Sequence, residues 1–130
     1  MLTRSIFFAL FNPKDPAHTK ANLFTREYTG RVLTTPWVLI ELADGWAKPS
    51  AWRNAFANLW VDLRANPHVA ITPCSDRLLS DGVSLFSQRQ DKEWSLTDCI
   101  SFVVMMEEGL TDALTADRHF EQAGFVALLK

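Results

Sequence analysis

Apolar residues recur every three or four positions along three stretches of the chain, and each stretch follows a serine. This spacing places apolar side chains on one face of a helix, and serine is favoured just before a helix begins. After Ser50 the apolar positions are Trp52, Ala55, Phe56, Leu59, Trp60 and Leu63, and Asn66-Pro67 ends the stretch. After Ser75 the side chains expected to face the core are Leu78, Leu79, Val83 and Phe86. After Ser95 a helix is predicted as far as Glu108, with Ile100, Val103 and Val104 in the core.

Three further helices are predicted in the N-terminal part of the chain. The first runs from Ser5 to Asn12. The second is expected to be capped by Asp15, with Pro16 in the first helical position, and to end at Gly30. The third opens at Thr35-Pro36 and stops near Gly45.

Short apolar runs between the helices predict strands at residues 31–33, 69–72, 113–115 and 125–128. Strands that alternate with helices imply a parallel sheet with helices on both faces. A length of 130 residues is that of one domain. The fold class predicted is therefore α/β.

Two aspartates lie at positions where an open α/β sheet can bind a ligand, although each can also be explained as a helix cap. Asp117 comes just after the run at residues 113–115, and sites in open α/β sheets lie at the carboxyl ends of strands. Asp98 lies in the first turn after Ser95, so the two carboxylates can converge if that helix begins beside the strand. Converging carboxylates are the ligands that Mg²⁺ and Mn²⁺ prefer. The alternative is that Asp98 completes a capping box with Ser95 and that Asp117 only caps a short helix.

A glutamate is a third candidate ligand because of its surroundings. Glu41 lies among Leu39, Ile40 and Leu42 on the predicted third helix. A carboxylate in such a setting is costly to bury unless it is paired or coordinated. An exposed position on the helix is the alternative.

Two motifs and two longer segments together resemble the PIN domain family. The motifs are Ser95-Leu96-Thr97-Asp98-Cys99 and Thr115-Ala116-Asp117-Arg118-His119-Phe120, and the segments are 10–18 and 34–41. PIN domains are small metal-dependent ribonucleases, and many are the toxins of VapBC-type toxin–antitoxin pairs. The resemblance covers nearly the whole chain.

The resemblance implies a fold, a site and partners. The fold would be a single PIN-like domain over residues 1–130, a three-layer α/β/α arrangement with a short central parallel sheet. Glu41, Asp98 and Asp117 would be catalytic and would bind Mg²⁺ or Mn²⁺. Ser5, Thr97 and Thr115 would support them. The substrate would be RNA, and a cognate antitoxin and a second copy of the chain would be protein partners.

The chain departs from the family pattern at Thr3. The position corresponds to a fourth acidic residue at the end of an N-terminal strand, and only Met1 and Leu2 precede it. We therefore expect the first strand to be cut short. Either the strand begins upstream of Met1, or the site is weakened. One alternative function is a catalytically inactive PIN-like module that binds RNA or protein, and another is an unrelated α/β interaction domain.

The net charge and the composition limit the classes of partner that the protein can bind. A net charge of −2 and a pI near 5.9 do not draw the whole protein onto nucleic acid, so local bases must contact phosphate. The candidates are Arg4, Arg31, Arg77, Arg89, Lys92 and Arg118, although most of them can be ordinary surface charges. No apolar run is long enough to cross a membrane, the apolar N-terminus is too short for a signal peptide, and Cys74 and Cys99 lack metal-type spacing. A cytoplasmic protein with reduced thiols is expected.

His119 and the tryptophans can each be explained by an ordinary structural role or by a functional one. A metal can lower the pKa of its own bound water, so the chemistry does not need His119 as a general base. Five tryptophans are many for this length, and most are expected in the core. The segment from Trp46 to Trp60 can alternatively form a dimer face or a groove for a partner helix.

Overall fold

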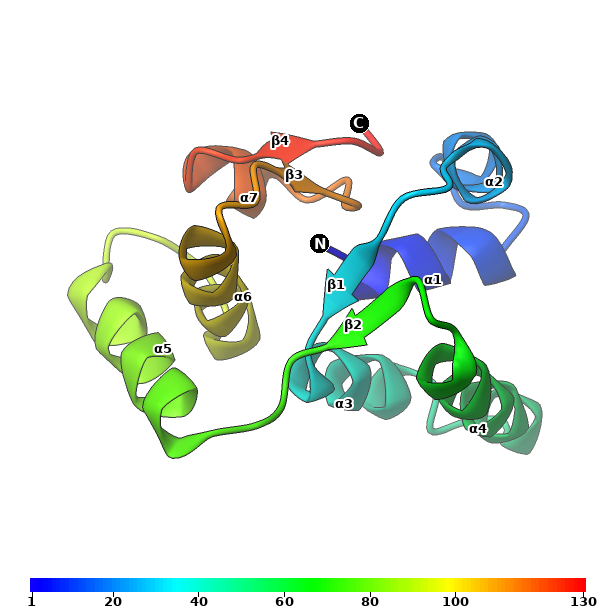
Figure 1. Ribbon diagram of the computed structural model, residues 1–130, viewed down its shortest axis with the longest axis horizontal. Coiled ribbons are helices and arrows are strands. Elements are labelled where there is room, and N and C mark those ends of the chain that lie inside the picture. The colour runs from blue at the N-terminus through cyan, green and yellow to red at the C-terminus, as the bar shows by residue number, and fades with distance from the viewer.

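The computed structural model describes residues 1–130 and consists of helices arranged around a set of short parallel strands (Figure 1). The helices are α1 (Arg4–Phe11), α2 (His18–Glu27), α3 (Pro36–Gly45), α4 (Ser50–Ala65), α5 (Asp76–Gln88), α6 (Leu96–Glu108) and α7 (Arg118–Gln122). The strands are β1 (Val32–Thr34), β2 (Val69–Ile71), β3 (Asp112–Ala113) and β4 (Val126–Ala127).

The first three residues of the chain join two strand pairs. β1 pairs in parallel with β2, and β3 pairs in parallel with β4. Between them the Leu2 N–H donates to the Leu33 carbonyl at 2.7 Å, and the Leu114 N–H donates to the Met1 carbonyl at 2.8 Å. Residues 1–3 therefore lie in the middle of the sheet, between β1 and β3.

Successive residues of these extended segments point to opposite faces of the sheet, as a pleated strand requires. Leu2 and Leu114 belong to a buried cluster with side chains of α1 to α4, whereas Met1 and Ala113 belong to a cluster with side chains of α6 and α7. Helices thus cover both faces. The predicted three-layer α/β/α arrangement with a short parallel sheet is confirmed.

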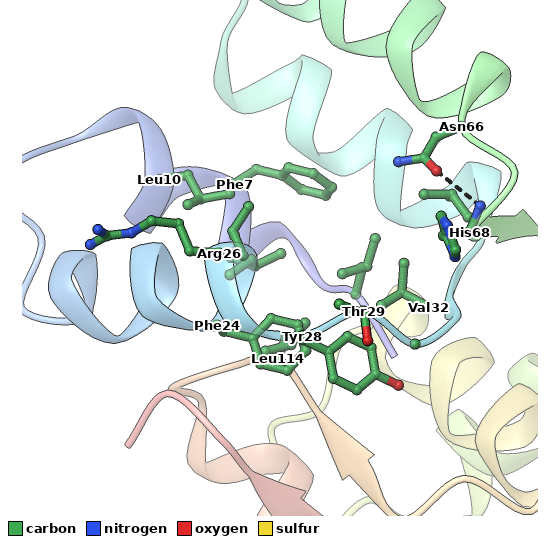
Figure 2. Close-up of a pocket in the computed structure, with 15 residues that line it drawn as sticks. Phe7, Leu10, Phe24, Arg26, Tyr28, Thr29, Val32, Asn66, His68 and Leu114 are labelled. Carbon is green, nitrogen blue, oxygen red and sulfur yellow. Dashed lines mark hydrogen bonds between the residues drawn. The ribbon is translucent and has the colours of Figure 1, made fainter.

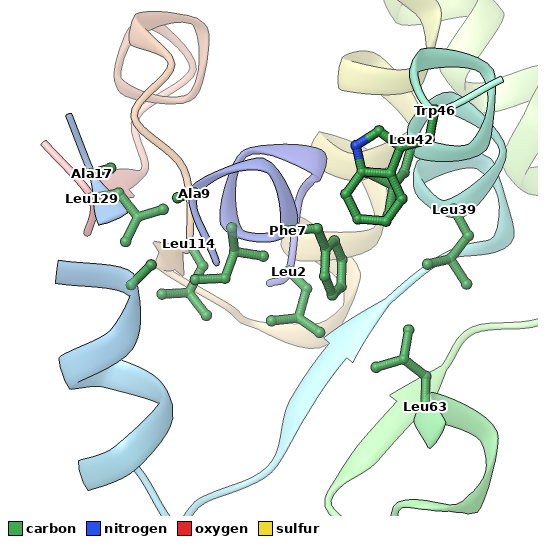
Figure 3. Close-up of a cluster of buried hydrophobic side chains, with 12 residues drawn as sticks. Leu2, Phe7, Ala9, Ala17, Leu39, Leu42, Trp46, Leu63, Leu114 and Leu129 are labelled. Carbon is green, nitrogen blue, oxygen red and sulfur yellow. The ribbon is translucent and has the colours of Figure 1, made fainter. Parts of the chain in front are cut away.

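An apolar cavity of about 470 Å³ lies between α1, α2 and β1 (Figure 2). Phe7 and Leu10 line it from α1, Phe24 from α2 and Val32 from β1. Beyond it, the cluster of α1 to α4 continues through Phe7, Leu39, Leu42 and Trp46 (Figure 3). This packing fixes the start of α1 relative to α3, which positions the site described below.

Three helix starts follow from local sequence as predicted. The Thr35 hydroxyl accepts a hydrogen bond from the Val38 N–H, and the Ser75 hydroxyl accepts one from the Leu78 N–H. Ser95 and Asp98 form a complete capping box at α6, and Ile100 and Val104 are buried as expected.

The second and fourth helices begin differently from the prediction. Asp15 accepts a hydrogen bond from the Ala17 N–H at 2.8 Å, so it stabilises the turn before α2, and α2 starts only at His18. The same helix ends at Glu27, before Gly30. Ser50 is the first residue of α4 and not its cap, because the extended residue before the helix is Pro49.

The inward face predicted for α5 was wrong in part. Leu78 is buried, but the side chains of Leu79, Val83 and Phe86 are 38%, 46% and 49% exposed. The reason is the close packing of α5 on α6: a Cβ atom at Gly82 would lie 2.4 Å from Ile100 Cγ1. The face that contains Gly82 therefore turns inward. On α4, Leu63 is buried, whereas Trp52, Phe56 and Leu59 are half-buried and Trp60 is exposed.

Candidate active site

A small polar cavity lies where α1, α6 and α7 begin, with α3 beside it. Its volume is about 20 Å³, enough for a ligand the size of one water molecule. The lining includes all six residues that the sequence analysis singled out: Ser5, Glu41, Thr97, Asp98, Thr115 and Asp117. Thr3, Arg4 and Ser101 also line it. The structure therefore brings the three acidic candidates together around one space.

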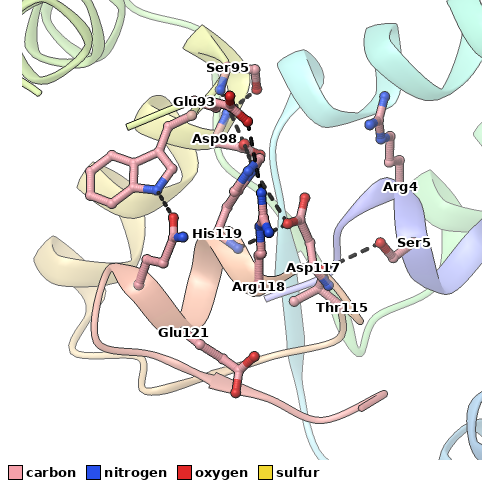
Figure 4. Close-up of polar contacts among 12 residues, drawn as sticks. Arg4, Ser5, Glu93, Ser95, Asp98, Thr115, Asp117, Arg118, His119 and Glu121 are labelled. Atoms are coloured by element: carbon pink, nitrogen blue, oxygen red, sulfur yellow. Dashed lines mark hydrogen bonds and ion pairs between the residues drawn. The ribbon is translucent and has the colours of Figure 1, made fainter. Parts of the chain in front are cut away.

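The two aspartates are held by the helices that they cap (Figure 4). The Ser95 N–H donates to Asp98 Oδ2 at 3.2 Å, and the Ser95 hydroxyl accepts from the Asp98 N–H at 3.0 Å. Asp117 Oδ1 accepts from the His119 N–H at 2.9 Å. The capping explanation is thus correct for both residues, and it is compatible with ligand binding. A helix N-terminus also stabilises nearby negative charge.

His119 joins the two aspartates. Its Nδ1 lies 3.2 Å from Asp98 Oδ2 and 3.3 Å from Asp117 Oδ1. One donor atom from each of the three residues lies within 4.8 Å of the others. Two carboxylates and an imidazole at this spacing fit a divalent cation. The sequence analysis considered His119 only as a base, although its position two residues after Asp117 places both at the start of α7.

Glu41 faces the same cavity but has a cation as its neighbour. Its Oε1 lies 3.3 Å from Arg4 Nε, and its side chain is 23% exposed. Burial raises the pKa of Glu41 above its usual value, the Arg4 guanidinium lowers it, and Asp98 raises it further. Desolvation is therefore the largest cause of the raised pKa, and repulsion from the neighbouring carboxylates adds to it.

The hydroxyl groups around the cavity hold its backbone in place. Thr3 Oγ1 donates to the Leu114 carbonyl at 2.8 Å and accepts from the Ser5 N–H at 3.2 Å. Thr115 Oγ1 accepts from the Asp117 N–H at 3.0 Å and lies 3.2 Å from the Ser5 hydroxyl. Thr3 therefore caps α1 and links it to the segment after β3. Thr115 positions Asp117 through its backbone.

The larger apolar cavity is a poorer candidate for catalysis, despite its size. Its polar side chains include Arg26, His68 and Asn66, and no carboxylate lines it. Without an acidic ligand it cannot hold a hard cation. The chemistry therefore points to the small cavity.

Most of the candidate phosphate-binding bases have acidic partners. Arg77 pairs with Glu107 and Asp81, and Arg89 pairs with Asp91 through two contacts at 3.0 and 3.1 Å. Lys92 lies 3.8 Å from Asp91, and Arg118 lies 3.8 Å from Glu93. Lys92 and Arg118 share a polar cavity of about 220 Å³ with His119. Among the candidate bases, Arg4 lines the acidic cavity itself.

Known proteins resemble this chain in sequence and in fold. The model of the family described as "PIN domain" matches residues 1–126. The chain belongs to the PIN domain family. The structure is similar to the crystal structure of VapC20 from Mycobacterium tuberculosis, described as a sarcin–ricin loop cleaving toxin. The TM-score is 0.83 at 26% sequence identity, over 96% of this chain and 95% of that one.

The search of curated proteins finds no significant match. No helix of the structure has the length and apolar character needed to cross a bilayer.

Proposed function

We propose that this PIN domain is a metal-dependent ribonuclease that hydrolyses RNA phosphodiesters and serves as the toxin of a toxin–antitoxin pair. The observation that carries the proposal is the convergence of Glu41, Asp98 and Asp117 in one cavity of a VapC-like fold, with His119 close to both aspartates. A cognate antitoxin, a second copy of the chain and an action in the cytoplasm belong to the same proposal.

In this proposal Asp98, Asp117 and His119 would hold a divalent cation. Such a cation, when bound, activates water and stabilises charge on the phosphate. The chain supplies the positioning. The capping bonds from Ser95 and His119 fix the two aspartates, and the Thr115 hydroxyl fixes the backbone of Asp117. Rigid ligands keep the attacking water and the phosphate in a productive geometry.

The donor set favours Mn²⁺ over Mg²⁺. Mg²⁺ is bound almost entirely through oxygen, whereas an imidazole nitrogen suits transition metals. We expect Mn²⁺ to raise the melting temperature more than Mg²⁺ at equal concentration, because it binds the folded state more tightly. A larger shift with Mg²⁺ would contradict the involvement of His119.

The test of the proposed activity is cleavage of a single-stranded RNA with Mn²⁺, with EDTA as a blank. Asp98→Asn should remove the cleavage, since it removes one ligand charge. The matched control is Asp76→Asn, which changes an acidic residue in the first turn of α5, outside the cavity. Cleavage by Asp98→Asn at the wild-type rate would sink the assignment of this site.

A second candidate function is an RNA-binding or protein-binding module without catalysis. Thr3 favours it, because this neutral side chain stands where the family has an acidic residue and its hydroxyl is already used in two hydrogen bonds. Binding of RNA without any metal-dependent cleavage would support this second function over the first.

A further inference from the structure

The stability of α1 does not explain why an arginine occupies position 4. It is the first residue of α1, and a cation there opposes the partial positive charge of the helix N-terminus. No acidic residue of α1 compensates in the first turn. The side chain instead reaches the acidic cavity, where its Nε lies 3.3 Å from Glu41 Oε1.

The formal charges around the cavity favour a single bound cation. Glu41, Asp98 and Asp117 each carry a negative charge when ionised, and Arg4 carries one positive charge. The cavity is then neutralised by one divalent ion. An aspartate at position 3 and a neutral residue at position 4 would make the net charge of the cavity more negative by two. A second divalent ion would then be needed to neutralise it.

The contact with Glu41 leaves the Arg4 guanidinium accessible. The ion pair is made through Nε, and the side chain of Arg4 is 51% exposed. A guanidinium has further N–H donors on its two Nη atoms, which match the oxygens of a phosphate group. A cation at the rim of a metal site is placed to meet the same anionic substrate.

We propose that Arg4 acts as a fixed cation in place of a second metal ion. It keeps Glu41 as its partner, leaves one divalent ion to Asp98, Asp117 and His119, and binds an RNA phosphate at the cavity. This inference rests on the proposed function, since it requires both the metal site and an RNA substrate.

The first test is isothermal titration of the protein with Mn²⁺. The wild type should bind one ion per chain. Arg4→Gln should bind Mn²⁺ on the order of tenfold more tightly, because a nearby positive charge has been removed. Arg4→Lys keeps the charge and should behave as the wild type. Arg53→Gln is the matched control, since it removes one positive charge on α4, outside the acidic cavity.

The second test is the binding of a fluorescein-labelled single-stranded RNA of mixed sequence, measured by anisotropy in EDTA so that no cleavage occurs. Arg4→Gln should weaken binding and reduce the slope of log Kd against log salt by about 0.7, the value for one lost phosphate contact on a single strand. Arg4→Lys should restore most of the slope, and Arg53→Gln should leave it unchanged.

The outcomes separate this inference from the proposed function. A wild type that binds no Mn²⁺ overturns both. Binding of two ions by the wild type, or an affinity that Arg4→Gln leaves unchanged, overturns only the role of Arg4. An unchanged RNA salt slope in Arg4→Gln, or no RNA binding by the wild type in EDTA, overturns the phosphate contact.

Discussion

At the scale of single residues, Glu41 is the acid whose ionisation is most affected by the fold. Burial raises its pKa more than Arg4 lowers it. The folded state therefore favours the protonated carboxyl more than the unfolded state does. The stabilising contribution of this group is complete below its unfolded pKa and is lost as the pH rises through its folded pKa.

We predict that Glu41→Gln raises the melting temperature relative to the wild type at neutral pH in EDTA, and that this advantage disappears in acid. The glutamine mimics the neutral carboxyl that the site favours. Melting curves across the acidic range test this, with Glu108→Gln at the end of α6 as a control for the loss of one negative charge. A greater advantage in acid than at neutral pH would refute the direction.

Thr3→Asp is a second prediction at this scale, and the structure adds a cost to it. An added carboxylate at the cavity should strengthen Mn²⁺ binding, because affinity follows ligand charge. An ionised aspartate cannot donate to the Leu114 carbonyl as Thr3 does. The metal-free protein should lose about 1–3 kcal/mol of stability, the cost of an unsatisfied buried acceptor.

Titration with Mn²⁺ and chemical denaturation with and without Mn²⁺ measure both effects of Thr3→Asp. Thr3→Ser is the control, because it keeps the hydroxyl and adds no charge. RNA cleavage should rise in Thr3→Asp along with metal affinity. Strong Asp98-dependent cleavage by the wild type would show that position 3 does not limit activity.

At the scale of elements, α5 shows how close packing decides which face turns inward. Gly82 lets the α6 residue Ile100 approach, and the larger apolar side chains of Val83 and Phe86 are left at the surface. The spacing of apolar residues along α5 cannot reveal which face turns inward, because the contact depends on Ile100, a residue of α6.

We predict that Gly82→Ala destabilises the protein by about 1–3 kcal/mol, as overpacked sites do. The gain of about 1 kcal/mol in helix propensity offsets part of the clash. Ser84→Ala, on the exposed side of the same helix, is the control and should be close to neutral. Urea denaturation measures both, and an unchanged midpoint for Gly82→Ala would mean that the two helices separate easily.

The elements also show what the sequence can and cannot predict. Capping residues act within a few positions, so Ser75, Ser95 and Asp98 were interpreted correctly from local sequence. The Arg4–Glu41 pair joins α1 to α3 and could not be inferred without the packing of those helices. The three acidic candidates could be named from their positions and surroundings in the predicted elements, and the resemblance of their motifs to a family implied a catalytic role for them.

At the scale of the whole molecule, apolar side chains remain exposed in one row on α5. Leu79, Val83 and Phe86 follow a helical spacing on its outer face. We predict that the chain forms a homodimer and that this row contributes, whereas the segment from Trp46 to Trp60 was the earlier candidate. Two tryptophans of that segment, Trp46 and Trp52, stack on each other within the chain, with 5.2 Å between their ring centroids.

Light scattering at high micromolar concentration tests the dimer. Val83→Asp should give a monomeric mass, because a charge placed in an apolar interface is costly. Ser84→Asp, its neighbour in sequence, is the control. A monomeric wild type would refute self-association, and a dimeric Val83→Asp would exclude this face.

The placement of residues 1–3 in the middle of the sheet affects when the site can form during synthesis. Their partners on one side belong to residues 112–114, which a ribosome adds more than 100 residues later. The cavity draws its lining from Thr3, Glu41, Asp98 and Asp117, so it cannot assemble until Asp117 has been translated. Contacts so distant in sequence also form slowly. A nascent chain that ends before Asp117 would thus lack the complete acidic cavity that the proposed cleavage of RNA requires.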